Sequence, residues 1–219
     1  MNQSNSKILV HFTGIDHKRG IRKPQDVSFE IILNILPERS FRVSLSEREL
    51  HIPRKIFNLK IPMTCFSETP VHFLRQHMNI FGDFGIGMNF DWGIESGFLN
   101  VIYSDNLKPN FYSMMLSELW EYLYSLGGIS NPNISCNWLY SLVGSTENIR
   151  YRDEREWRYI SKYTDLSENY NPLSICFLKK DVNSIFVPRE YVNRLNEFLD
   201  KDQFLKDSKI QVIPSEEII

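Results

Sequence analysis

The 219-residue sequence lacks several features that mark particular classes of protein. Its three cysteines, Cys65, Cys136 and Cys176, lie far apart and are odd in number, which argues against a disulfide framework and favours a reducing compartment. No apolar run approaches the roughly 20 residues that span a bilayer, and residues 1–7 are polar, without the apolar core of a signal peptide. We therefore expect a cytoplasmic protein with a flexible N-terminus at residues 1–6 and no membrane partner.

The sequence also lacks an excess of either charge, internal repeats and low-complexity linkers. Its 25 basic and 27 acidic residues leave a net charge of −2, so no global basic field indicates nucleic-acid binding, although a local basic patch is compatible with this balance. The composition is 42% hydrophobic and 24% charged, which suits a chain that buries a full core. We expect residues 1–219 to form a single domain.

Apolar periodicity predicts both helices and strands along the chain. Helices are predicted over residues 26–36, 69–81, 113–126 and 188–199, with a short one near 138–143. Strands are predicted over residues 7–12, 61–66, 84–90, 98–103, 156–161, 173–179, 184–187 and 209–214. Because the two types mix without strict alternation, the predicted fold class is α+β, a single domain with a mixed or split, mostly antiparallel sheet.

Two of these helices have a predicted inward face. In the first helix Asp26 is the predicted N-cap, and the apolar face consists of Val27, Ile31, Ile32, Ile35 and Leu36. In the third, the stripe that we expect to be buried consists of Leu116, Leu119, Trp120, Leu123 and Leu126.

The most informative stretch is residues 151–160, where charged and aromatic side chains are packed together. Six charged residues occupy the seven positions 152–158 and lead directly into a strand-like segment that contains Trp157 and Tyr159. A carboxylate held among arginines at a strand edge fits a ligand cleft. A salt-bridged start of a strand accounts for the same pattern equally well, and the residues alone leave both interpretations open.

A histidine and a hydroxyl group end the first predicted strand, at His11 and Thr13. A pair of this kind at a strand end can hold a polar ligand, although a histidine in this position is more often a structural hydrogen-bonding group. Residues 81–87 have the glycine spacing G-x-x-G-x-G, which differs from the dinucleotide-binding order. Glycines there admit a ligand, or they form a bulge or a tight turn from helix to strand.

No metal site is predicted. Cys65, His72 and His77 have spacings that fit no standard zinc pairing, and a fourth ligand is not evident. The sequence also has no P-loop and no recognisable order of serine, histidine and aspartate.

Four segments together resemble the AbiGi family of bacterial abortive-infection proteins, which are described as antitoxins of phage-defence pairs. They are HFT at 11–13, CFSETP at 65–70 with the later His77, FGDFGIGMNF at 81–90 running to FLNVIY, and YRDEREWR at 151–158. The resemblance extends from about residue 8 to residue 214. Gly14 stands where a lysine is expected, and a Pro-Val pair is missing before Tyr103. The resemblance implies a protein of anti-phage abortive infection with a cognate toxin or antitoxin partner.

The order of a histidine strand followed by a glutamate strand more remotely resembles the ADP-ribosyltransferase superfamily, in particular its DarT-like group. This resemblance implies an ADP-ribosyltransferase-like fold, with NAD as the substrate and a nucleic acid or a protein as the acceptor. It makes Glu156 and His11 the catalytic residues, with Glu154 as the competitor of Glu156. The cofactor-binding residues that it implies are Thr13, Phe84, Gly85, Arg155 and Arg158.

The proposed chemistry explains these residue types, because cleavage of the nicotinamide bond builds positive charge on the ribose. A carboxylate stabilises that charge, and guanidinium groups match the phosphates of NAD. The resulting hypothesis is an NAD-dependent ADP-ribosyltransferase in which His11, residues 81–87 and Glu156 line one cleft. The alternative is a non-catalytic antitoxin that neutralises a toxin by direct binding. A plain nucleic-acid-binding module is the least favoured class, given the acidic balance.

Overall fold

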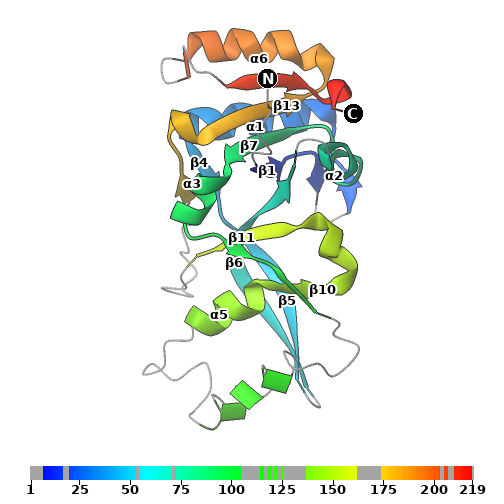
Figure 1. Ribbon diagram of the computed structural model, residues 1–219, viewed down its shortest axis with the longest axis vertical. Coiled ribbons are helices and arrows are strands. Elements are labelled where there is room, and N and C mark those ends of the chain that lie inside the picture. The colour runs from blue at the N-terminus through cyan, green and yellow to red at the C-terminus, as the bar shows by residue number, and fades with distance from the viewer. Residues whose placement is uncertain are drawn as a thin grey trace. The chain divides into compact units, whose positions relative to one another are not determined.

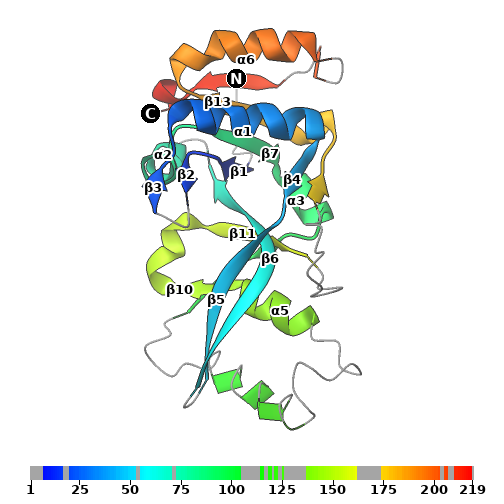
Figure 2. The ribbon, with the colours of Figure 1, turned by 180° about the vertical axis from the view of Figure 1, so that it is seen from behind.

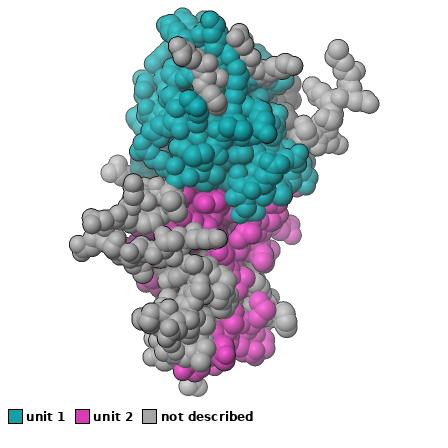
Figure 3. Space-filling view, turned by 90° about the vertical axis from the view of Figure 1, so that its left-hand side faces the viewer, with its two compact units in different colours: residues 1–42, 65–98, 174–219 teal, residues 43–64, 99–173 magenta. Residues whose placement is uncertain are grey.

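The computed structural model describes residues 7–16, 20–52, 55–70, 73–104, 114–115, 118–119, 121–122, 125, 137–161, 174–202, 205–206 and 210–218. The chain divides into two compact units, coloured separately in Figure 3. The first comprises residues 1–42, 65–98 and 174–219, and the second comprises residues 43–64 and 99–173. Strand β6 (Lys55–Thr69) contributes to both. That residues 1–219 form a single domain stays a prediction.

The first unit is built on a mixed sheet with the strand order β14-β13-β7-β1-β6. Its strands are β1 (Ile8–Phe12), the end of β6, β7 (Gly85–Asn89), β13 (Val182–Val187) and β14 (Gln211–Pro214). Neighbours are antiparallel except β13 and β14, which are parallel. Two small antiparallel pairs accompany it: β2 (Ile15–Asp16) with β3 (Ile21–Arg22), and β4 (Ser40–Arg42) with β12 (Ser174–Cys176).

Helices α1 (Gln25–Glu38), α2 (Leu74–Phe81), α3 (Phe90–Glu95) and α6 (Arg189–Lys201) also belong to this unit. The 3-10 turns η3 (Lys179–Asp181) and η4 (Ser215–Glu217) complete it. Helices α1 and α6 lie side by side (Figures 1 and 2) and contact each other through Tyr191 of α6. Its hydroxyl donates a hydrogen bond to Asp26 at 3.0 Å, and its ring centroid lies 4.8 Å from that of Phe29.

Both faces of β1 are buried in the first unit. Ile8, Val10 and Phe12 point to one face and pack with Leu74 and Met78 of α2. On the other face, His11 contacts Phe41 and Phe66. These two belong to an aromatic cluster that also contains Trp92, Phe98 and Phe177. This double burial explains why the strand reads as an almost continuous apolar run in the sequence.

The second unit contains the first part of β6, which pairs with β5 (Ser44–Ile52) in a long antiparallel ribbon from Ser44↔Met63 to Ile52↔Lys55. β11 (Glu156–Ile160) lies between β6 and β8 (Leu99–Asn100). β9 (Ile102–Ser104) runs parallel to β10 (Thr146–Asn148). Helix α5 (Asn137–Gly144) and the 3-10 turn η2 (Ile149–Glu154) flank β10 in the chain.

The predicted α+β class with a mixed, mostly antiparallel sheet is confirmed. The predicted strands at residues 7–12 and 156–161 and the helix at 188–199 are found almost at their expected bounds. Within the described residues, no helix is both long and apolar enough to cross a membrane.

The start of the second predicted helix is wrong. We expected it at Thr69-Pro70, but Thr69 continues β6, where it pairs with Ile8, and α2 begins at Leu74. The buried Thr69 hydroxyl lies 2.7 Å from Nδ1 of His77. Strand pairing and this side-chain contact therefore outweigh the capping preference of threonine.

The first helix was predicted with the wrong cap and with a face that is only partly right. Helix α1 begins at Gln25, directly after Pro24, and Asp26 caps nothing. The side chains that it buries are Ser28, Phe29, Ile32 and Leu36, whereas Val27 is exposed. Ile32 and Leu36 are buried as predicted and Ile31 and Ile35 are half-buried, so the prediction erred at Val27 and missed Phe29.

Two further predictions are decided only in part. Where a turn was expected around residues 93–97, the chain forms helix α3 up to Glu95 and turns only after it. The described residues between 114 and 125 are helical, and Leu119 is half-buried. Leu116, Trp120, Leu123 and Leu126, the rest of the predicted stripe, lie outside the described residues.

Candidate functional site: a buried arginine and carboxylate network

The charged stretch folds as the turn η2 followed by strand β11. Asn148 caps η2, because its Oδ1 accepts a hydrogen bond from the Arg150 amide at 3.0 Å. Arg155 then adopts a left-handed conformation with φ of 46°, and its amide bonds back to the Arg152 carbonyl. Because of this reversal, Glu154 belongs to η2 and Glu156 opens β11, so strand alternation does not relate the two carboxylates.

Arg158 is the centre of the site, with a side chain that is only 1% exposed. Its Nη1 donates to the carbonyl of Gly144 at 2.6 Å and to that of Thr146 at 3.1 Å. Its Nη2 donates to Glu147 at 2.8 Å and to Glu156 at 2.5 Å. One guanidinium group thus joins the end of α5, strand β10 and strand β11.

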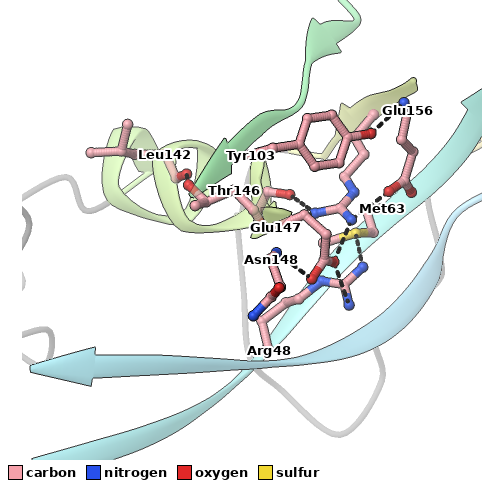
Figure 4. A network of polar contacts seen from close by, with 10 residues as sticks. Arg48, Met63, Tyr103, Leu142, Thr146, Glu147, Asn148 and Glu156 are labelled. Carbon is pink, nitrogen blue, oxygen red and sulfur yellow. Dashed lines mark hydrogen bonds and ion pairs between the residues drawn. The ribbon is translucent and has the colours of Figure 1, made fainter. Parts of the chain in front are cut away.

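Two further side chains complete the network shown in Figure 4. Arg48 of β5 lies 3.5 Å from the Glu147 carboxylate and 3.8 Å from the sulfur of Met63. Tyr103 of β9 accepts a hydrogen bond from the Glu156 amide at 2.7 Å. We call Arg48, Tyr103, Glu147, Glu154, Glu156 and Arg158 the charge network.

The surroundings of Tyr103 and Glu147 shift the pKa values of both groups. Burial raises the pKa of Tyr103 to about 12, with smaller contributions from Glu156 and Glu154. Burial also acts to raise the pKa of Glu147. The Asn148 amide, the hydrogen bond from Arg158 and the charge of Arg48 outweigh it, so the pKa of Glu147 lies below its usual range.

Glu154 is the carboxylate that the network leaves uncompensated. Three carboxylates, those of Glu147, Glu154 and Glu156, face only two guanidinium groups. Within the part of the chain that the structure describes, the Glu154 side chain makes no hydrogen bond or ion pair. Burial, followed by the charges of Glu156 and Glu147, raises its pKa to about 7. A carboxyl group of this kind can exchange a proton near neutral pH.

The first unit contains four further predicted site residues, and each has an internal contact. His11 is half-buried, with Nδ1 3.0 Å from the carbonyl of Cys65 and its ring packed against Phe41 and Phe66. Thr13 is buried and donates a hydrogen bond to the Ser28 carbonyl at 3.0 Å.

Phe84 and Gly85 are likewise buried in the first unit. Phe84 packs edge-on against Tyr191 of α6, with the ring centroids 5.2 Å apart. Gly85 opens β7, where it pairs with Phe12 of β1. Gly82 ends α2 with φ of 93°. The backbone of Gly14 packs closely against this turn, because a side chain at Gly14 would lie 2.7 Å from the Phe81 carbonyl oxygen. The glycines at 82 and 85 therefore serve a helix-to-strand turn and close strand packing.

Glu156 and Arg158, both predicted from the sequence, are brought into direct contact, and Arg155 lies on the exposed turn beside them. His11, Thr13, Phe84 and Gly85 belong to the first unit and Glu156 to the second, so a shared cleft stays a prediction. No metal-binding group of three or more histidine, cysteine or acidic residues occurs among the described residues.

Sequence reasoning missed three members of the network, namely Arg48, Tyr103 and Glu147. Arg48 and Glu147 lie in polar, unremarkable segments. Glu147 contacts Arg158, and Arg48 contacts Glu147, only because β5, β10 and β11 come together. The segment around Arg48 has four consecutive polar residues, 46–49, and so lacks the alternation that would mark a strand with one face turned inward.

These observations define a mixed α+β protein whose second unit is organised around a buried network of arginine and carboxylate side chains. Residues 30–214 match the family of abortive phage resistance proteins AbiGi, which is described as an antitoxin family. The match covers most of the chain, so the protein belongs to the AbiGi family. Neither the curated proteins nor the solved structures contain a match to the chain.

Proposed function

We propose that the protein is the antitoxin of an abortive-infection pair and that it acts by binding its toxin directly. The observation that carries this proposal is the state of Arg158. A guanidinium group that holds the phosphates of NAD has to reach the ligand, but this one is buried and donates to two carbonyl groups and two carboxylates. The charged stretch thus supports a salt-bridged start of a strand rather than an open phosphate site.

The family supports the same proposal, because its description combines phage resistance with the word antitoxin. The internal contacts of His11 and Thr13 are also compatible with it, since both side chains bond to backbone carbonyl groups of the first unit. A non-catalytic binding protein needs these residues only for its fold.

The test is co-expression of the chain with the product of the gene adjacent to its own. The adjacent product alone is expected to arrest bacterial growth, and the chain is expected to relieve the arrest and to co-purify with that product. Growth arrest by the chain alone, or failure of the purified pair to associate, would contradict the proposal.

A second candidate, ADP-ribosyl transfer from NAD to a nucleic acid or protein, is favoured by one observation. Glu154 is half-buried and has a pKa of about 7, and it lies beside Glu156, the predicted catalytic carboxylate. Such a pair of carboxyl groups in different environments is typical of acid and base chemistry.

For this candidate, Glu156→Gln is expected to lower NAD consumption roughly a hundredfold, since loss of an electrostatic contact in the transition state costs about 3 kcal/mol. Glu154→Gln serves as the comparison, and thermal melts establish that both variants fold. If the wild-type protein does not consume NAD with nucleic-acid or protein acceptors, the transferase reading is abandoned and the binding function stands.

A further inference from the structure

The turn η2 separates its charges between the inside and the outside of the second unit. Glu156 is buried against Arg158, whereas the side chains of Arg150, Arg152 and Arg155 are exposed. Asp153 is the exposed carboxylate among them. The outward charge of this segment is therefore positive, in a chain whose net charge is −2.

Apolar and aromatic groups accompany these arginines. Ile149 at the start of η2 is 42% exposed, and Ile102 on β9 is 45% exposed. The guanidinium group of Arg150 lies 4.5 Å from the centre of the Tyr151 ring. We call Ile102, Ile149, Arg150, Tyr151, Arg152 and Arg155 the η2 surface. Arginine and tyrosine are among the residue types that contribute most to protein interfaces.

The backbone beneath the η2 surface is held in place before any partner binds. Asn148 caps the turn, and the left-handed Arg155 closes it. Directly afterwards the Glu156 carbonyl accepts a hydrogen bond from the Val101 amide at 2.9 Å, and its carboxylate is bound to Arg158. A preorganised turn loses little conformational entropy on association.

We propose that the η2 surface is the docking site for an acidic face of the toxin, a proposal that rests on the antitoxin function. Charge complementarity selects the partner, because exposed guanidinium groups pair with carboxylates. A protein is favoured over a nucleic acid for two reasons. The chain as a whole has no basic field, and the exposed Ile102 and Ile149 suit the apolar side chains of a protein better than phosphate groups.

The test measures binding of the purified product of the adjacent gene to the full-length chain by calorimetry. The double variant Arg150→Glu/Arg152→Glu is expected to raise the dissociation constant at least tenfold. Added salt should weaken binding of the wild type more steeply than binding of the variant. The matched control is Lys180→Glu/Lys201→Glu, which makes the same charge change at exposed positions of the first unit and is expected to stay within twofold of wild type.

Circular dichroism and the gentler pair Arg150→Ala/Arg152→Ala separate loss of contact from loss of fold. Equal binding by wild type and a folded Arg150→Glu/Arg152→Glu variant overturns the docking site but leaves the antitoxin function intact. If the wild type does not bind the adjacent product, both proposals fail. If the double variant loses affinity only for a duplex oligonucleotide, the surface belongs to a nucleic acid and the proposal is overturned.

Discussion

At the scale of single residues, Arg158 joins three elements of the second unit within the described part of the chain. It pairs with the carboxylates of Glu147 and Glu156 and donates to the carbonyl groups of Gly144, which ends α5, and of Thr146, which begins β10. Arg158→Met leaves Glu156 without its ion-pair partner and Glu147 with Arg48 alone, so we expect the free energy of unfolding to fall by about 3–5 kcal/mol. Urea denaturation measures this. Arg152→Met, at an exposed position, is the control and should change stability by less than about 0.5 kcal/mol; equal losses in both would refute the central role of Arg158.

Glu154 gives the protein a distinct dependence on pH. Its pKa is raised to about 7 in the folded state, so between its ordinary value and 7 the folded protein binds more protons than the unfolded chain. The contribution of Glu154 to the free energy of unfolding is therefore fully present at low pH, and it is lost as the pH rises from the ordinary pKa of a carboxyl group through about 7. Partial exposure screens the effect, and we expect a loss of about 1–2 kcal/mol.

Glu154→Gln should remove this loss, since the amide does not ionise. Relative to wild type, the variant is expected to gain stability at pH 8 and to gain almost none at pH 4, as measured by urea midpoints at both values. Glu197→Gln, at an exposed position of α6, is the matched control. A gain that is the same at both pH values would contradict the assignment, because it would not arise from ionisation.

At the scale of elements, the pairing of β7 with β13 depends on a glycine. A side chain at Gly87 would place its Cβ 2.6 Å from the Ser184 hydroxyl and 3.2 Å from the Phe186 ring. Gly87→Ala is therefore expected to cost about 1–3 kcal/mol through overpacking, as measured by thermal and urea unfolding.

The rescue experiment for this pair uses Ser184→Ala. The Ser184 hydroxyl is buried and has no hydrogen-bond partner among the described residues, so its removal alone should be close to neutral. In the double variant it should recover part of the cost of Gly87→Ala. Strictly additive effects in the double-mutant cycle would show that the two positions do not collide.

At the scale of the whole molecule, β6 is the element that the two units share. Residues 55–64 of the strand belong to the second unit and residues 65–69 to the first. We expect both units to lose amide protection in one cooperative transition, because unfolding of either removes a strand from the other.

Hydrogen exchange along a urea series can test this cooperativity. The segments to compare are residues 182–199 in the first unit and residues 141–161 in the second. Loss of protection in one segment at a clearly lower urea concentration would show that the units unfold independently.

The amino-acid sequence by itself determined the local elements and the identity of the charged stretch. Periodicity records which side chains are buried, so β1, β11 and α6 were predictable from spacing alone. The family was likewise visible in ordered short motifs. Local preferences gave a wrong prediction where a residue distant in the sequence forms a strand pair. At Thr69 a helix start was predicted, but Thr69 pairs with Ile8 and continues β6.

Only the tertiary structure decided which partners the charged side chains of residues 151–160 have. Glu147 and Arg48 are more than 10 and 100 residues away from Arg158, respectively, and no local rule selects them as its neighbours. Whether a carboxylate faces an arginine, another carboxylate or water depends on strand pairing and on the left-handed turn at Arg155. Burial and proximity set the pKa of Glu154 and leave Arg158 inside and Arg150 outside, because electrostatic energy depends on position in space rather than on position in the chain.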